Sequence, residues 1–143
     1  MKKLLSGMLV SLFSSIAIAT PITLQHASTT YANAGICSAA IDITIHDFLE
    51  AKDKLYLDLI VTNNTGVVQG SSKDVITSND VDNLQGKAFG RVFIESENMC
   101  AADQTWTVKV KRAVLVLNGK QQDLLKTNEV YVDDFQPMRF KVN

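Results

Sequence analysis

The stretch Gln104–Leu125, QTWTVKVKRAVLVLNGKQQDLL, decides the fold class. Its apolar residues alternate with polar ones, which is the period of a half-buried β-strand. Near residues 111–113 the apolar row moves by one position. A β-bulge, or a strand that crosses from one sheet to the other, produces such a shift. The first row consists of Trp106, Val108 and Val110, and the second of Ala113, Leu115 and Leu117.

The dipeptide Asn118-Gly119 follows this strand and predicts a tight hairpin turn. Both central residues of a type I′ turn need positive φ, which Asn and Gly adopt most easily. Trp106 is expected to anchor the core. We interpret the runs 129–135 and 138–142 as the last strands, with Met138, Phe140 and Val142 facing inward and Arg139 and Lys141 outward.

Three segments upstream also show strand patterning. Residues 54–62 alternate strictly, and residues 39–46 do the same. The charged link 47–53 between them is short, which predicts that they form an antiparallel hairpin. In residues 87–97 both faces are partly apolar, with Phe89 and Phe93 on one side and Val92 and Ile94 on the other, so we expect a central strand. Residues 69–86 are rich in Ser, Asn, Asp and Gly, and we interpret them as a long loop or as loops flanking a minor edge strand.

These segments predict an all-β protein. No run of ten residues has a helical period, and about seven strands fit between turn signals. We therefore expect a single-domain antiparallel β-sandwich with immunoglobulin-like topology. A small closed barrel is the alternative.

The chain begins with the pattern of a secretory signal peptide at residues 1–19. Lys2 and Lys3 precede a short apolar run that ends in Ala17-Ile18-Ala19. Several serines interrupt this run, and it is short for a membrane anchor. We predict cleavage near Ala19, a polar leader or edge segment at 20–36 and the sandwich domain at 37–143. The mature protein is expected to be periplasmic or secreted, without stable membrane insertion.

The two cysteines, Cys37 and Cys100, predict one disulfide in an exported chain. Their spacing fits neither a CxxC redox motif nor a zinc cluster. The bond would join the first strand region to a point past the middle of the chain, as a clamp between two sheets.

Charge argues against a nucleic-acid partner, which would require a basic face. Without Lys2 and Lys3 the chain holds 12 basic and 15 acidic residues, a net charge of −3. The charge is uneven: residues 20–103 carry −6 and residues 104–143 carry +3. A solvated charge mosaic explains this, and so does a charged partner surface or head-to-tail self-association.

Candidate catalytic and metal sites are poorly supported, and we expect no enzyme activity, no metal and no cofactor. His26 and His46 lack the spacing of zinc ligands, and no serine has an activating motif. A calcium loop from Asp80 fails at its sixth and twelfth positions, and the Glu95 and Glu97 pair lacks any sign of a desolvated cleft.

The surface is therefore the expected working part. Apolar or aromatic residues on a nominally outward sheet face, together with acids in 69–86, are candidates for partner contact. They are Tyr56, Ile60, Val114, Val116, Tyr131, Asp74, Asp80 and Asp82. The alternative is that the protein's own strands and loops cover these residues.

Three functional hypotheses remain open. The first is an exported protein-binding module, such as an inhibitor or immunity-type protein that inserts the 69–86 segment into a partner; it could also pair with itself as a homodimer. The second is a filament subunit, since the layout resembles that of chaperone-assembled fimbrial subunits. The leader would be a poor donor strand, because only Ile22 and Leu24 alternate. The third is a small secreted hydrolase.

Overall fold

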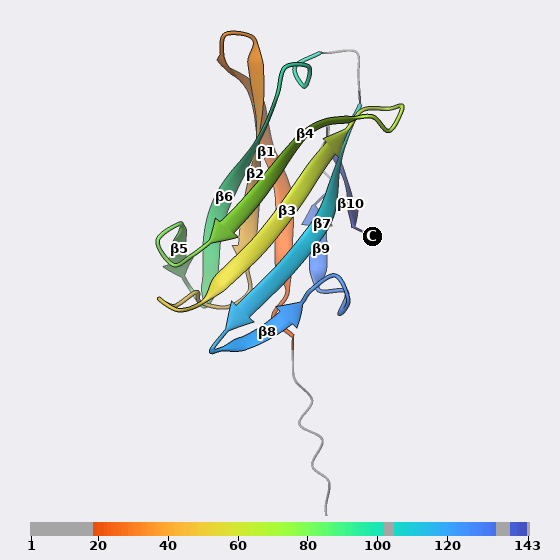
Figure 1. Ribbon diagram of the computed structural model, residues 1–143. Coiled ribbons are helices and arrows are strands. Elements are labelled where there is room, and N and C mark those ends of the chain that lie inside the picture. The colour runs from red at the N-terminus through yellow and green to blue at the C-terminus, as the bar shows by residue number, and fades with distance from the viewer. Residues whose placement is uncertain (1–18, 102–104, 134–137, 143) are drawn as a thin grey trace, which may run out of the picture.

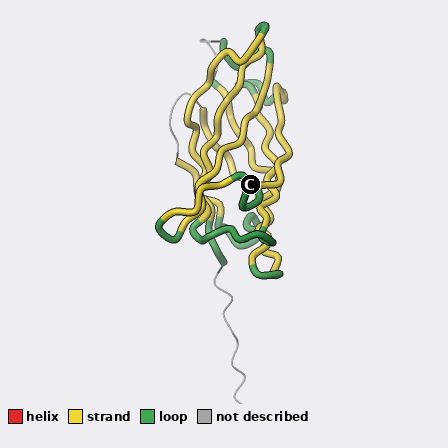
Figure 2. Tube along the Cα trace, turned by 90° about the vertical axis from the view of Figure 1, so that its left-hand side faces the viewer, coloured by secondary structure: helices red, strands yellow, loops and turns green. Residues whose placement is uncertain are grey.

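The computed structural model describes residues 19–101 and 105–133, and the backbone of 138–142. The predicted signal peptide therefore lies outside the described residues, as do the side chains of the last strand. The described residues form ten strands and no helix, packed as two layers (Figures 1 and 2). The predicted all-β sandwich is confirmed, although it has more strands than the seven or so that we expected.

Each sheet contains five strands. Sheet A has the order β5-β6-β2-β1-β9, and sheet B has the order β10-β7-β3-β4, with β8 beside β7. Sheet A comprises β1 (Ile22–Asn33), β2 (Ile36–Ile45), β5 (Val81–Leu84), β6 (Lys87–Ser96) and β9 (Val130–Asp133). Sheet B comprises β3 (Lys54–Thr62), β4 (Val68–Ile76), β7 (Trp106–Leu117), β8 (Lys120–Asp123) and β10 (Met138–Val142).

The strand order is that of an immunoglobulin sandwich. In that fold strands A, B, E and D form one sheet and C, F and G the other. The orders β1-β2-β6-β5 and β3-β7-β10 reproduce both sets. Two pairings depart from an antiparallel arrangement, because β9 is parallel to β1 and β10 is parallel to β7.

The core lies between the sheets and is built from the alternating residues of each strand. Trp106 is 2% exposed and belongs to this core, as expected. The predicted bulge in β7 is confirmed, since the pairing with β3 shifts between Asp58 and Leu59 and leaves Lys111 extra. Asn118 and Gly119 both have positive φ and form the β7–β8 turn.

The predicted hairpin between residues 39–46 and 54–62 is wrong. These segments belong to β2 and β3, which lie in different sheets. The link between them crosses from sheet A to sheet B. Three features fix the position of this link. Leu49 is fully buried, and Asp53 is 3% exposed. The Leu49 backbone N–H donates to Asn83 Oδ1 at 3.0 Å, and Asn83 Nδ2 donates to the Leu49 carbonyl oxygen at 2.9 Å.

The interpretation of residues 69–86 as a long loop is also wrong. Most of these residues form the edge strands β4 and β5, on different sheets. Gly70 allows β4 to lie close to β6, because a Cβ there would be 2.7 Å from the backbone oxygen of Glu95. The polar composition reflects edge strands with one solvated face.

Candidate protein-binding site

The described residues contain no grouping of three or more His, Cys, Asp or Glu side chains that could hold a metal. Among them there is also no helix with the length and apolarity needed to cross a membrane. The candidate sites are therefore three surfaces: a projecting hairpin and the outward faces of the two sheets.

The hairpin of β1 and β2 rises to the top of Figure 1. The inner half of β1 lies between β2 and β9. The described part of β9 pairs with Ile22–Gln25, so residues 28–33 have a neighbouring strand on one side only among the described residues. Nearly every residue from 27 to 36 is exposed, and the Tyr31 side chain is 73% exposed. The predicted leader is thus a paired strand that becomes an edge in its outer half.

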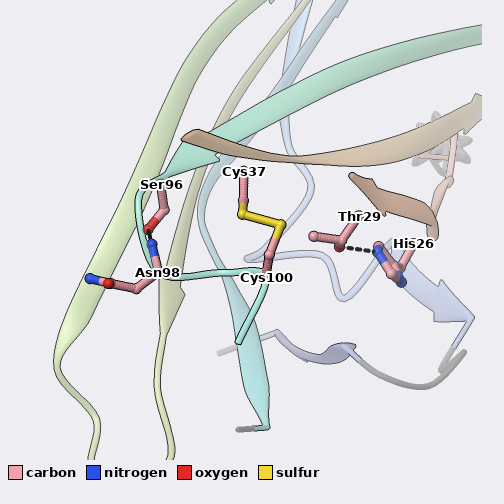
Figure 3. The surroundings of a disulfide bond; sticks show 6 residues. All are labelled: His26, Thr29, Cys37, Ser96, Asn98 and Cys100. Atoms are coloured by element: carbon pink, nitrogen blue, oxygen red, sulfur yellow. Dashed lines mark hydrogen bonds between the residues drawn. A yellow bond between two sulfur atoms is a disulfide. The ribbon is translucent and has the colours of Figure 1, made fainter. Parts of the chain in front are cut away.

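A disulfide holds this hairpin close to its turn, because Cys37 is paired with Tyr31 directly before the last pair, Asn33 with Ile36 (Figure 3). The predicted bond between Cys37 and Cys100 is confirmed, with a Cα–Cα distance of 5.7 Å. Cys100 lies in the loop after β6, where the backbone N–H of Asn98 donates to Ser96 Oγ and the Asn98 side chain donates to Gln69 Oε1 on β4. The loop therefore connects the hairpin to both sheets.

His26 lies where β1 leaves the sandwich. It is 6% exposed, and its Nε2 is hydrogen-bonded to Thr29 Oγ1 at 2.8 Å (Figure 3). Burial lowers the pKa of His26, although a backbone hydrogen bond at Ser28 opposes the shift. The packing around His26 thus favours its neutral form. His46 lies on the exposed side of the sheet and is hydrogen-bonded to Thr23.

The outward face of sheet B brings four predicted contact residues together. Register places Tyr56 opposite Val114, and Val116 and Ile60 lie along the same two strands. This face is partly covered by its own side chains, because the Arg112 guanidinium lies 4.7 Å from the centre of the Tyr56 ring and Val114 is 8% exposed. Its charge is mainly basic, with outward-facing Lys54, Lys73, Lys109 and Arg112 against Asp58 and Asp123.

The outward face of sheet A holds three other predicted contact residues, Tyr131, Asp80 and Asp82. Tyr131 is 54% exposed and pairs with Thr23 of β1. Asp80 and Asp82 border an open hollow of about 560 Å³, together with Asp42, Phe89 and Arg91 among others. Hydrogen bonds from the Thr77 hydroxyl and backbone N–H lower the pKa of Asp80, so its carboxylate is charged at neutral pH.

Asp74 lies apart from both groups. It pairs with Leu57 of β3 and shares the inward phase of Ile76, and its Oδ2 is buried without a hydrogen-bond partner. The eight predicted contact residues are therefore divided between two opposite faces and one inward position, and they do not form one site.

Sequence reasoning missed the two exposed phenylalanines on sheet A. Phe89 is 40% exposed and Phe93 is 55% exposed, on the outward face of β6. A signal was present, because Arg91 and Glu95 have the same phase as the phenylalanines. Charged residues in phase with aromatic ones indicate a solvent-facing side of the strand.

Comparison with known proteins places the chain in a family. No curated protein matches it in sequence. The solved structure of IrmA from Escherichia coli is similar, with a TM-score of 0.51 and 16% sequence identity over 87% of this chain and 100% of that chain, which shows a shared fold. The model of the family described as "IrmA: interleukin receptor mimic protein A" matches residues 22–132, so the chain belongs to the IrmA family.

Proposed function

We propose that this chain is an exported, non-enzymatic receptor mimic that binds an interleukin. Membership of the IrmA family across residues 22–132 carries the proposal, because the family is named for mimicry of an interleukin receptor. The matched region contains the projecting hairpin, both cysteines of the disulfide and nearly all of the outward face of sheet A.

The architecture supports this function. A mimic requires a rigid scaffold whose exterior meets another protein, and aromatic residues are enriched where proteins bind each other. Tyr31, Phe93 and Tyr131 are each more than half exposed on such a scaffold. A structural disulfide is typical of exported proteins, which supports a periplasmic or secreted location. Action on an interleukin favours release from the cell.

The other hypotheses receive less support. An inhibitor that inserts the 69–86 segment into a cleft would need a loop there, and the segment forms β4 and β5. Deleting residues 70–83 would therefore dismantle both sheet edges. A filament subunit would lend residues 22–33 to a neighbour, and these residues pair with β2 of the same chain.

A binding panel tests the proposal. The mature chain, from Thr20 onward, is immobilised and exposed to a set of purified interleukins, with unrelated small secreted proteins as controls. We expect saturable binding by at least one interleukin at micromolar concentration or below. A soluble ectodomain of that interleukin's own receptor should compete, since a mimic occupies the receptor's place. An absence of binding across the panel would refute the proposal.

A further inference from the structure

The register of sheet A gathers polar and aromatic side chains into continuous outward rows. One row runs across four strands in the order Phe89 of β6, Thr44 of β2, Thr23 of β1 and Tyr131 of β9, and each residue is paired with the next. On its other side Phe89 is opposite Asp82 of the edge strand β5. Small polar residues therefore occupy the middle of the face, with exposed aromatic rings on both sides of them.

The next row carries an ion pair. Arg91 Nε donates to Asp42 Oδ1 at 2.6 Å, and Asp42 is opposite Gln25 on β1. Of the three carboxylates that border the hollow on this face, Asp42 is compensated by Arg91. Asp80 and Asp82 have no such cationic partner among the described residues.

The face as a whole is acidic as well as aromatic. Among the described outward residues, four strand carboxylates and Asp80 of the preceding turn oppose two cations. The carboxylates belong to Asp42, Asp80, Asp82, Glu95 and Asp133, and the cations to Lys87 and Arg91. Four large exposed apolar side chains share this outward phase: Leu84, Phe89, Phe93 and Tyr131.

Sheet B lacks this combination among its described side chains, which exclude those of β10. Its outward face is mainly basic, and Arg112 covers the ring of Tyr56. Exposed aromatic area near the centre of an interface contributes most of the binding energy, and charge complementarity selects the partner. Both arguments favour sheet A as the docking surface.

We propose that the outward face of sheet A is the docking surface for the protein partner, and that the partner presents a basic segment there. Its Arg or Lys side chains reach Asp80 and Asp82, and its apolar part covers Phe89 and Phe93. The Phe89 ring borders the same hollow as the carboxylates, so a guanidinium can contact both a charge and an aromatic face. This inference rests on the proposed function for the identity of the partner.

Matched pairs of variants test the surface. Phe93→Ala removes an exposed ring from sheet A, and Val75→Ser removes an apolar side chain of similar exposure (51%) from the outward face of sheet B. Asp82→Lys reverses a charge on sheet A, and Lys73→Glu does so on sheet B. All four residues are exposed, so the variants should retain the wild-type circular dichroism spectrum and melting temperature.

Binding to the interleukin found in the panel gives the first readout. We expect Phe93→Ala and Asp82→Lys each to weaken binding at least tenfold, and the two sheet B variants to remain within twofold of wild type. The Asp82→Lys loss should appear largely as slower association and should shrink at high salt. The reverse pattern, or no loss with any variant, would overturn the proposal.

A second readout separates this inference from the proposed function. Uniformly 15N-labelled protein is titrated with the peptide acetyl-Arg-Leu-Arg-Leu-Arg-amide and with its Glu analogue. We expect the Arg peptide alone to shift the amide signals of β5, β6 and the facing part of β2, even if no interleukin binds. Shifts confined to the hairpin or to sheet B would overturn the inference.

Sedimentation tests whether a second copy occupies the face through its basic sheet B. Suppose that wild type self-associates, that Asp82→Lys and Lys73→Glu each lose this association alone, and that a mixture of the two variants restores it. The partner on the outward face of sheet A is then another copy of this chain. That result would also overturn the proposal. Monomeric behaviour of all variants supports a separate partner.

Discussion

Asp53 provides a stringent test of how the two sheets are connected. It ends the link between β2 and β3 and is 3% exposed. Its Oδ2 accepts the backbone N–H of Glu50 at 2.9 Å, and its Oδ1 accepts the backbone N–H of Asn118 at 2.8 Å. One carboxylate therefore holds the link and the β7–β8 turn together.

Replacing Asp53 by Ala removes both hydrogen bonds and leaves two backbone donors without this acceptor. A hydrogen bond to a charged group contributes about 1.5–3 kcal/mol, so the pair contributes at least about 3 kcal/mol. An open hollow of about 350 Å³ borders Asp53 and Asn118, and water there can reach the freed donors. We therefore expect a loss near the lower end, about 3 kcal/mol of the free energy of unfolding.

Urea unfolding measures this loss, with fluorescence of the single, buried Trp106 as the probe. Asp47→Ala is the matched control, because the exposed Asp47 accepts a single backbone N–H, from Phe48, at 2.8 Å. The control should lose less than about 0.5 kcal/mol. Asp53→Asn should lose less than Asp53→Ala, since its amide oxygen can still accept one bond. If Asp53→Ala and Asp47→Ala have equal stability, the reasoning is wrong.

Two further predictions concern the β1–β2 hairpin. Replacing both Cys37 and Cys100 by Ala should lower the free energy of unfolding by up to about 4 kcal/mol, because the disulfide closes a loop with a sequence separation of 63 and so restricts the entropy of the unfolded chain. In urea unfolding, wild-type protein with the disulfide reduced should have the same stability as this variant. Burial lowers the pKa of His26 in the folded protein below its ordinary 6.5. As the pH falls, His26 therefore becomes protonated in the unfolded chain at a higher pH than in the folded protein. The stability that neutral His26 provides is thus complete above about pH 6.5 and is lost progressively below it. The decline in stability between pH 7.5 and 5 should be smaller in His26→Gln than in wild type.

Much of the fold could be predicted from local patterns. The period of two identified β2, β3, β6 and β7, the displaced apolar row identified the bulge at Lys111, and Asn118-Gly119 identified the turn. Each signal arises from neighbouring residues that face the core alternately. The predicted export signal and the pair of cysteines were sufficient to predict the disulfide.

Sheet membership could not be predicted in the same way. Alternation shows which side of a strand is apolar, but it does not show which sheet contains the strand. The link 47–53 has a length suitable for a hairpin and for a crossing. What fixes the crossing is tertiary: burial of Leu49, the Asn83 bonds to its backbone and the two bonds accepted by Asp53.

For residues 69–86 the sequence suggested at most a minor edge strand between loops, because the sequences of edge strands are shaped by solvent. β4 is exposed along one face and carries Gly, Ser, Lys and Asp, residues that also occur in loops. The outer half of β1 has solvent on both faces, so its sequence has no apolar period to detect. The exposed phenylalanines of β6 were missed for the opposite reason, since two apolar faces suggested full burial.

The uneven charge along the chain does not divide simply between the two sheets. Residues 20–103, which are acidic overall, supply β1, β2, β5 and β6 of sheet A and also β3 and β4 of sheet B, whereas the basic residues 104–143 supply β7, β8 and β10 of sheet B and β9 of sheet A. The contrast between the two faces instead depends on which charged side chains point outward, and among the described residues these are mainly carboxylates on sheet A and mainly cations on sheet B. A partner with a basic segment is attracted to sheet A and repelled from sheet B, so the orientation of the encounter is selected before any aromatic contact forms.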